Sequence, residues 1–214
     1  MIVDERMITY INSLDRGHTE FLENLQREAK AADVPIIRRE MQSFLKVFLK
    51  IRQPQSILEV GAAVGFSAIL MAEYGAADSR ITTIENYDKR IPIARENFRK
   101  SGYDDRITLL EGDAAEVMKT LDGPYDFIFM DAAKGQYIHF LPEVKRLMAK
   151  GSVLISDNVL QEGDIIESHY IVERRNRTIY KRMREYLRTL KDDPDFETSI
   201  VPIGDGISIS VKNS

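Results

Sequence analysis

The sequence SILEVGAAVGFS, residues Ser56–Ser67, predicts a buried strand that runs into a glycine-bearing turn and then a helix. Ile57, Leu58 and Val60 give its first part the apolar character of a strand that is covered on both faces. Gly61 and Gly65 allow close backbone approach where the helix begins. Such a turn is typical of sites for nucleotide-type ligands, although plain strand-to-helix packing also uses glycine in this way.

Ala63 occupies the position where a dinucleotide-binding turn has its second glycine, which lets a pyrophosphate lie against the backbone. A cofactor without a pyrophosphate therefore fits better, and S-adenosylmethionine is such a cofactor. We expect Glu59, at the carboxyl end of the strand, to lie near its sulfonium charge. The N-terminus of the next helix and the Ser67 hydroxyl are expected to bind its carboxylate.

Length and composition indicate one compact α/β domain over residues 1–214. The chain has 214 residues, 43% of them hydrophobic, which suffices for a full core but is short for two domains. The absence of cysteine excludes disulfides, thiolate catalysis and cysteine-bound zinc or iron–sulfur centres. Because the N-terminus lacks a signal-peptide core and no run is long enough to span a membrane, we expect a soluble, cytoplasmic protein. The net charge of −4 argues against a uniformly basic nucleic-acid-binding protein but permits a basic patch.

Residues 1–52 show helical periodicity and are expected to form a flank or lid. Two amphipathic segments are broken near Gly17, Pro35 ends the second, and a third runs from about Arg38 to Ile51. After residue 56, predicted strands (81–85, 107–113, 125–131, 152–158) alternate with predicted helices (88–100, 115–121, 136–148). This alternation implies right-handed crossovers and a mainly parallel, Rossmann-like sheet. Two final strand-like runs, 196–203 and 206–211, are joined at Gly204–Asp205–Gly206, and this tight Asp-Gly turn predicts a C-terminal antiparallel hairpin.

Acidic residues end five successive predicted strands, and they are Glu59, Glu85, Asp113, Asp131 and Asp157. Ligands of parallel sheets bind outside the carboxyl ends of the strands, so these side chains are expected at one site. Glu85 is placed to accept hydrogen bonds from both ribose hydroxyls of a nucleoside, and Asp113, with Ala114, to lie beside the adenine. The alternative role for any single one of them is a helix N-cap.

Asp131, Asp157 and Asn158 end neighbouring strands and offer two carboxylates and one amide oxygen. This set of hard oxygen ligands suits Mg²⁺ or Ca²⁺ and is poor for zinc. A substrate with two adjacent oxygens could chelate the ion, which would lower the pKa of the oxygen that reacts. Lys134 could then complete the deprotonation or hold the oxyanion. An Asx-turn at Asp157–Asn158 and a solvated loop lysine are the alternatives.

The motifs SILEVGAAVGFS, TTIE, EGDA, FMDAAK, SDN and GDG follow one another in this order. In this order and spacing they resemble the metal-dependent O-methyltransferases related to catechol and caffeoyl-CoA methyltransferases, over nearly the whole chain from Arg38 onward. The resemblance implies a seven-stranded class I methyltransferase fold, a homodimer, S-adenosylmethionine as methyl donor and a divalent ion, usually magnesium.

Position by position, the resemblance also assigns the site residues. The cofactor positions are Ile37, Glu59, Gly61, Gly65, Ser67, Glu85, Asp113, Ala114 and Asp131. The metal positions are Asp131, Asp157 and Asn158, and the catalytic positions are Lys134 and Asp131. The chain departs from the family at Glu40–Met41, where a Glu-x-Gly or Glu-Gly pair is usual. The lid residue that contacts the cofactor is therefore either Ile37 or Ile36.

The segment Glu173–Lys191 is unusually basic, with eight Lys or Arg residues against two Glu. On a helix, Arg174, Arg177, Lys181, Arg184 and Arg188 share one face, opposite Ile179, Met183, Leu187 and Leu190. A solvated helix face is the alternative, but such faces usually mix charge signs. The residues expected to bind an anionic partner are Arg38, Arg39, Arg174, Arg175, Arg177, Lys181 and Arg184.

This basic segment resembles that of the bacterial tRNA 5-hydroxyuridine O-methyltransferases, which produce 5-methoxyuridine at the wobble position. The 5-hydroxyl and 4-carbonyl of that base are adjacent oxygens, and an anticodon loop presents unstacked bases. A tRNA anticodon stem-loop is therefore the expected partner. A catechol-type or caffeoyl-CoA-like small molecule is the alternative substrate, with coenzyme A phosphates as another reason for the arginines. An NAD-dependent oxidoreductase is disfavoured by Ala63 and by the metal set. A catalytically silent RNA-binding protein is disfavoured by the intact group Asp131, Lys134, Asp157 and Asn158, which RNA binding alone would not need.

Overall fold

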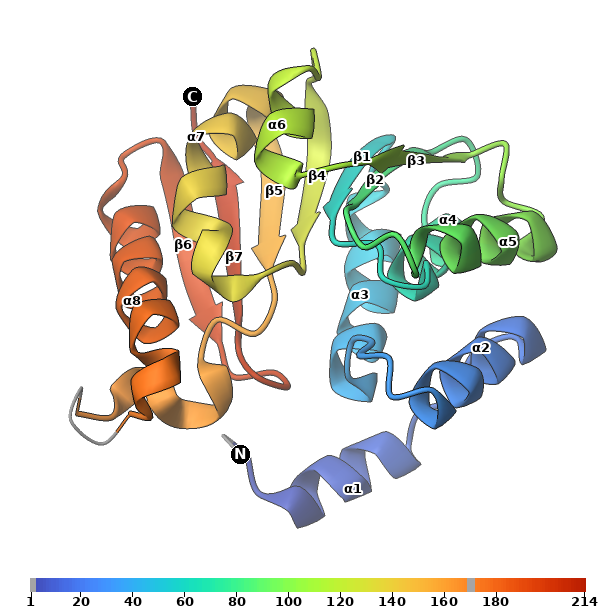
Figure 1. The fold of residues 1–214 in the computed structure, drawn as a ribbon, viewed down its shortest axis with the longest axis horizontal. Helices are drawn as coiled ribbons and strands as arrows, with labels where there is room; N and C mark the ends of the chain where they lie inside the picture. Colours follow the sequence, from blue (N-terminus) through green and yellow to red (C-terminus); the bar gives the residue numbers. More distant parts are fainter. Residues whose placement is uncertain (1–2, 169–171) are drawn as a thin grey trace.

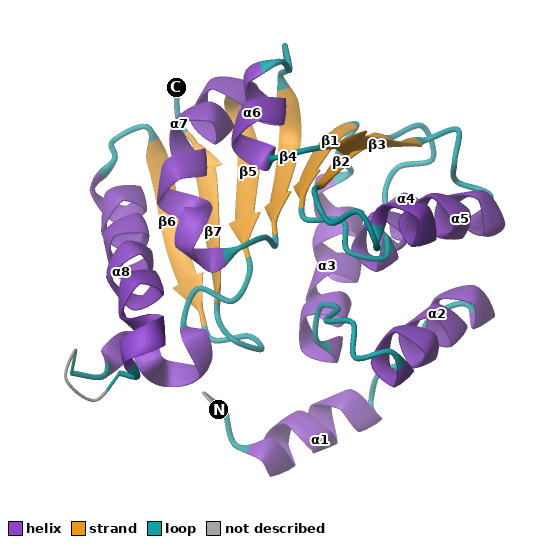
Figure 2. Ribbon diagram, viewed as in Figure 1, coloured by secondary structure: helices purple, strands orange, loops and turns teal. Residues whose placement is uncertain are grey.

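The computed structural model describes residues 3–168 and 172–214, which form a central sheet with helices on both faces (Figures 1 and 2). The seven strands are β1 Ser56–Val60, β2 Arg80–Glu85, β3 Ile107–Glu111, β4 Tyr125–Met130, β5 Met148–Ser156, β6 Phe196–Val201 and β7 Ile207–Lys212. Their order across the sheet is β3-β2-β1-β4-β5-β7-β6. β1 to β5 pair in parallel, while β7 is antiparallel to both β5 and β6. The predicted Rossmann-like methyltransferase fold with a C-terminal hairpin is thereby confirmed.

Alternating side chains of the strands divide the interior into two cores. In β4, Phe127 and Phe129 belong to one core and Ile128 and Met130 to the other, as the two-residue period of a strand requires. The first core is covered by α2 Glu20–Ala31, α3 Arg39–Arg52, α4 Phe66–Tyr74 and α5 Ile91–Ser101. The second is covered by α6 Ala114–Lys119, α7 Tyr137–Leu147 and α8 Arg177–Asp192.

The N-terminal flank packs unevenly on the domain. α2 and α3 bury apolar residues in the first core, whereas α1 Glu5–Ser13 buries none. Its apolar residues Met7, Tyr10 and Ile11 are exposed. The Lys46 ammonium of α3 holds the end of this region by an ion pair of 3.0 Å with Asp15. The segment that joins α2 to α3, residues 32–38, reaches the carboxyl ends of the strands.

The structure corrects the predicted elements at three places in particular. β5 begins at Met148, four residues before the predicted Ser152, because Met148 pairs with Tyr125 ahead of a register shift in β4. The C-terminal hairpin has a five-residue connection, residues 202–206, in place of a tight turn. Its carbonyl groups accept hydrogen bonds from the segment after β5, which a two-residue turn could not reach. The basic helix starts at Arg177, after a separate 3₁₀ turn, η3 Arg174–Asn176.

None of the helices in the described ranges is both long enough and apolar enough to cross a bilayer.

Candidate active site

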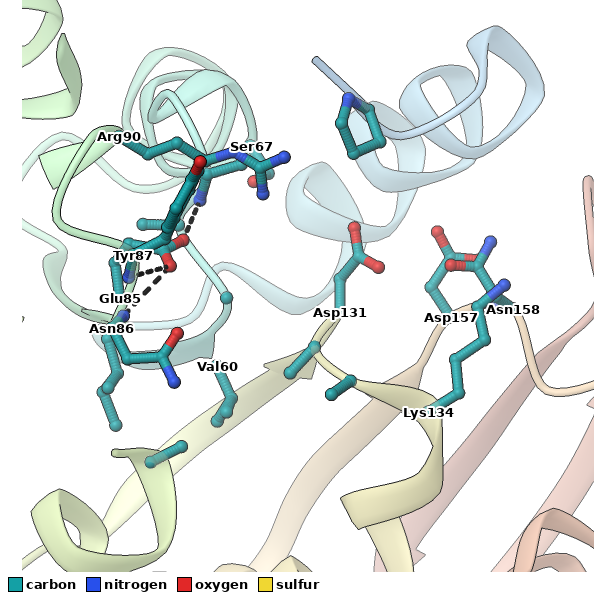
Figure 3. A pocket seen from close by; sticks show the side chains of 18 of the residues that line it. Val60, Ser67, Glu85, Asn86, Tyr87, Arg90, Asp131, Lys134, Asp157 and Asn158 are labelled. Carbon is teal, nitrogen blue, oxygen red and sulfur yellow. Dashed lines mark hydrogen bonds between the residues drawn. The ribbon is translucent and has the colours of Figure 1, made fainter. Parts of the chain in front are cut away.

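A cleft of about 630 Å³ lies at the carboxyl ends of β1, β2, β4 and β5. The strand order reverses between β1 and β4, which is where parallel sheets leave a crevice for ligands. Figure 3 shows two groups of polar side chains in the cleft. One contains Ser67, Glu85, Asn86, Tyr87 and Arg90, and the other contains Asp131, Lys134, Asp157 and Asn158. The segment Pro35–Arg38, which includes the predicted Ile37, also lines the cleft.

Gly61 brings the two groups together through the backbone. Its φ is +105°, and a Cβ at this position would collide with the carbonyl oxygen of Asp131. The Asp131 N–H donates to the Val60 carbonyl at 3.0 Å, so the ends of β1 and β4 remain side by side. The close approach at Gly61 is therefore to the backbone of Asp131, the first residue of the predicted metal set, and a contact of Gly61 with the cofactor stays a prediction.

Gly65 and Glu59, both predicted as cofactor contacts, are not among the residues that line the cleft. Gly65 has a φ of +86°, caps α4 and lies against the Phe98 ring. Glu59 is fully buried and accepts a hydrogen bond from the Thr83 hydroxyl. Burial raises the pKa of Glu59 to about 7, against the lowering effect of the neighbouring Ser67 and Thr83 hydroxyls. Glu59 thus lies behind the cleft wall, next to Ser67, which does line the cleft.

Glu85 lines the cleft and is held by the backbone around it. Its Oε2 accepts from the Ala63 N–H at 2.7 Å, and its Oε1 accepts from the N–H groups of Asn86 and Tyr87 at 3.0 and 2.9 Å. A carboxylate has about four acceptor positions, so three are already used. The ribose contact stays a prediction. The structure adds a second role, which is to hold the glycine turn against the end of β2.

Asp113 and Ala114 line the cleft beyond Glu85. The Asp113 Oδ1 accepts from the N–H groups of Ala115 and Glu116 at 2.9 and 3.4 Å, which makes Asp113 the N-cap of α6. The capping role and the position in the cleft are therefore both present at this residue.

Asp131, Asp157 and Asn158 converge on one side of the cleft (Figure 3). The Asp157 N–H donates to the Met130 carbonyl at 2.9 Å, which continues the pairing of β4 and β5 to the site. The Tyr137 hydroxyl lies 3.2 Å from the carbonyl oxygens of both Met130 and Asp157 and ties the two strand ends together. Asn158 has a φ of +58°, and its N–H donates to Asp157 Oδ1 at 2.7 Å.

The electrostatics of this group favour a cation. Burial raises the pKa of both Asp131 and Asp157, the charge of Asp131 raises that of Asp157 further, and Lys134 opposes both shifts. In residues 3–168 and 172–214, no three His, Cys, Asp or Glu side chains are grouped to hold an ion by themselves. The two carboxylates and the Asn158 amide nevertheless fit Mg²⁺, which usually takes one or two carboxylates and completes its shell with water and substrate.

Lys134 begins a 3₁₀ turn, η1 Lys134–Gln136, at the edge of this group. Arg182 of α8 donates from Nη1 to the carbonyl oxygen of Gly135 at 3.1 Å. The turn that carries the predicted catalytic lysine is thus fixed to the basic helix. Sequence reasoning missed Arg182, because nothing in a sequence pairs two residues that are 47 positions apart.

The two arginines of the N-terminal flank have acidic partners within the chain. Arg38 pairs with Glu162 and Asp205, each at 2.9 Å, and lines the cleft. Arg39 pairs with Glu23 of α2 at 2.9 Å. Both guanidinium groups therefore have acidic partners within the chain, and their contact with RNA stays a prediction.

Some basic residues of α8 and of the turn before it have partners within the chain. Arg184 donates to the Ile165 carbonyl at 3.1 Å and Arg177 to the Val172 carbonyl at 3.1 Å, while Arg175, before the helix, pairs with Glu173. Most of this basic set is exposed, namely Arg174, Arg175, Lys181, Arg184 and Arg188. A second hollow, of about 380 Å³, is lined by Arg177, Thr178, Lys181, Arg182 and Glu185. The predicted apolar face is confirmed for Met183, Leu187 and Leu190, which are buried.

Comparisons with known proteins show the family to which the chain belongs. The O-methyltransferase family model matches residues 12–213. A catechol O-methyltransferase of Mycobacterium tuberculosis is 33% identical over 139 residues, which are 64% of this chain and 63% of that protein. A caffeoyl-CoA O-methyltransferase of Medicago sativa is 30% identical over 177 residues, which are 78% and 70% of the two chains.

Solved structures agree as well. An S-adenosylhomocysteine-bound methyltransferase of Podospora anserina has a TM-score of 0.88 at 26% identity and covers 98% of this chain and 95% of its own. A Staphylococcus aureus protein has a TM-score of 0.90 at 29% identity, with 98% and 100% covered. The chain therefore belongs to the O-methyltransferase family, and it is an S-adenosylmethionine-dependent O-methyltransferase of the catechol and caffeoyl-CoA type.

Proposed function

We propose that this enzyme, with bound Mg²⁺, methylates the 5-hydroxyl of 5-hydroxyuridine at the wobble position of tRNA. The observation that carries the proposal is the hydrogen bond of Arg182 to Gly135, which joins the basic helix to the Lys134 turn. A polyanion bound along α8 would lie beside the mouth of the cleft. The exposed Lys181 and the hollow next to it offer positive charge to stem phosphates.

The acceptor end of the cleft suits two adjacent oxygens, such as the 5-hydroxyl and 4-carbonyl of the base. Asp131, Asp157 and Asn158 would hold the ion, which supplies a lower pKa for the acceptor hydroxyl when it is bound. Lys134 Nζ then takes the hydroxyl proton or holds the oxyanion. The acceptor oxygen bonds to the methyl carbon as the carbon–sulfur bond breaks and its electron pair stays on sulfur, which leaves S-adenosylhomocysteine.

The donor end positions the cofactor for this transfer. Glu85, fixed by three backbone N–H groups, presents its carboxylate to the ribose, and Ser67 lies at the N-terminus of α4 for the methionine carboxylate. Because Gly61 holds β1 against Asp131, the donor and acceptor ends share one cleft. Holding both reactants in line supplies much of the acceleration.

A small catechol or a caffeoyl-CoA-like molecule is the second candidate substrate. It is favoured by the ion pairs of Arg38 and Arg39, which reduce the positive charge available to RNA at the N-terminal flank. The relatives named for catechol and caffeoyl-CoA methylation favour it too.

Methyl transfer from labelled S-adenosylmethionine distinguishes the two candidates. The acceptors are bulk tRNA from a strain that lacks this enzyme, catechol and caffeoyl-CoA, each with Mg²⁺ and again with a chelator. Label that appears in tRNA as 5-methoxyuridine, disappears with chelator and falls steeply with salt supports the proposal. Label that appears only in the small phenols contradicts the RNA substrate and keeps the cofactor and metal assignments.

The homodimer implied by the family resemblance is also proposed for this chain. Exposed apolar residues at α1 and α3, such as Leu14, the C-cap of α1, and Ile51 of α3, could be covered by a second copy. Sedimentation equilibrium of the wild type and of Leu14→Asp tests this, and a wild-type monomer would contradict it.

A further inference from the structure

Arg38 lies where three segments that are distant in the sequence meet at the rim of the cleft. Its Nη2 is 2.9 Å from Glu162 Oε1 and 2.9 Å from Asp205 Oδ2, across 124 and 167 positions of sequence. A Cβ at Gly204 would lie 3.5 Å from the Arg38 Cδ, so the stem of the arginine rests on the backbone of that loop.

Asp205 is a fixed anchor for this arginine. Its side chain is only 9% exposed, and its carbonyl oxygen accepts from the Leu160 N–H at 2.9 Å. The Gly206 carbonyl accepts from the Val159 N–H at 2.9 Å, and a Cβ at Gly206 would collide with the Leu160 side chain. The hairpin loop and the segment after Asn158 therefore form one unit.

The segment Pro35–Arg38 is also held on its other side, by the buried Gln42 side chain of α3. The Gln42 side chain of α3 donates from Nε2 to the Ile37 carbonyl at 2.7 Å and to Gln26 Oε1 at 2.8 Å. Gln42 and Gln26 are both buried. The segment Pro35–Arg38, whose residues all line the cleft, is thus tied to α3 on one side and to Asp205 on the other.

We propose that Arg38 is a positioning residue that fastens the segment Pro35–Arg38 over the cleft through its ion pair with Asp205. The pair with Glu162 contributes less, because that side chain is 66% exposed and exposed ion pairs are weak. The half-buried Arg38 and the buried Asp205 depend on each other, since either charge left alone is poorly solvated. The fastened segment encloses the cofactor, and in this respect the inference rests on the proposed function.

The test compares Arg38→Met with Arg39→Met. The methionine at residue 38 keeps a long stem against Gly204 and removes only the charge. Arg39 is a matched control, because it is adjacent, equally exposed (35% against 34%) and ion-paired at 2.9 Å, yet does not line the cleft. In the unliganded protein, hydrogen exchange of the amides of residues 36–38 should become about tenfold faster in Arg38→Met. The Kd for S-adenosylhomocysteine should rise about tenfold, because the segment Pro35–Arg38 spends less time in the position that encloses the cofactor.

Further variants distinguish the effect of losing the Arg38–Asp205 ion pair from the effect of a general loss of stability. Asp205→Asn should accelerate the same amides, the double variant should not exceed Arg38→Met, and Arg38→Lys should recover part of the effect. The inference is wrong if exchange of residues 36–38 is unchanged in Arg38→Met, or if Arg39→Met accelerates it equally. The exchange measurement needs no ligand, so a wild-type protein that does not bind S-adenosylhomocysteine would contradict the cofactor assignment alone.

Discussion

Gly61 lies so close to the carbonyl oxygen of Asp131 that no side chain fits between them. Gly61 belongs to the turn after β1, where the donor end of the cleft begins, and Asp131 is the first predicted metal ligand after β4. One backbone contact therefore sets the spacing between the two ends of the cleft.

Gly61→Ala should unfold at lower denaturant concentration and lose methyl transfer. The added methyl group collides with a backbone atom and also forces a residue with a Cβ to adopt a φ of +105°, which together cost on the order of 3 kcal/mol. Gly102→Ala is the control, because its φ is +75° and no atom lies within 4 Å of the added Cβ, so it should cost only about 1 kcal/mol. Equal losses in urea unfolding of the two variants would contradict the role of the Asp131 contact.

Glu59→Gln should stabilise the unliganded protein at alkaline pH. The folded pKa of about 7 lies above the ordinary value of 4.5, so the favourable contribution of the protonated carboxyl is complete below about pH 4.5 and is lost as the pH rises through 7. Glutamine stays neutral, so the stability of the variant relative to the wild type should increase by roughly 3 kcal/mol between pH 4.5 and pH 8. Urea unfolding at both pH values measures this, and a difference that does not change with pH would contradict it.

The sequence predicted the fold because its physical causes are local. The sequence alone shows the apolar residues Ile57, Leu58 and Val60, the alternation of strands with amphipathic helices, and the glycines at turns. Acidic strand ends predicted the site for a related reason, since parallel strands deliver their carboxyl ends to one edge. This reasoning placed Glu85, Asp131 and Asp157 in the cleft correctly.

The side-chain partners could not be predicted, because they join positions far apart in the sequence. The sequence analysis assigns Arg38 to an anionic partner, whereas its pairing with Asp205 depends on how the hairpin loop folds back. Glu59 was predicted as a cofactor contact because it lies at the carboxyl end of a strand, but its side chain is fully buried behind the residues that line the cleft. Strand periodicity gives the face of a sheet and not the depth at which a side chain lies.

Asp157→Asn should abolish methyl transfer and leave S-adenosylhomocysteine binding nearly unchanged. The amide oxygen can still accept the N–H of Asn158, so the local turn is kept while one negative charge is removed. We expect Mn²⁺ affinity, measured by electron paramagnetic resonance, to fall about hundredfold. If Asp157→Asn binds Mn²⁺ as tightly as the wild type, or loses S-adenosylhomocysteine binding in parallel, Asp157 is not a metal ligand of the kind predicted.

Glu85→Gln should weaken cofactor binding first and also lower stability. The amide nitrogen that replaces one carboxylate oxygen cannot accept, so an N–H of the glycine turn or of Asn86 and Tyr87 loses its partner, at a cost of about 1 to 3 kcal/mol. Glu111→Gln is a matched control, because Glu111 pairs in register with Glu85 on β3 but is exposed and bound to Arg95. Calorimetric titration with S-adenosylhomocysteine should show a loss for Glu85→Gln alone. Normal binding by that variant would contradict the role.

Arg182→Met should lower kcat about tenfold without changing the KM for S-adenosylmethionine, because a small displacement of a catalytic group is enough to slow transfer. The substitution removes the hydrogen bond to the Gly135 carbonyl that fixes the Lys134 turn, and it leaves the donor end of the cleft untouched. Arg52→Met provides the control, since Arg52 donates to the Gly151 carbonyl at the same distance of 3.1 Å but lies outside the cleft. If both variants lose stability to a similar degree and only Arg182→Met loses kcat, Arg182 positions the lysine. If kcat falls equally in both, the bond contributes to folding alone.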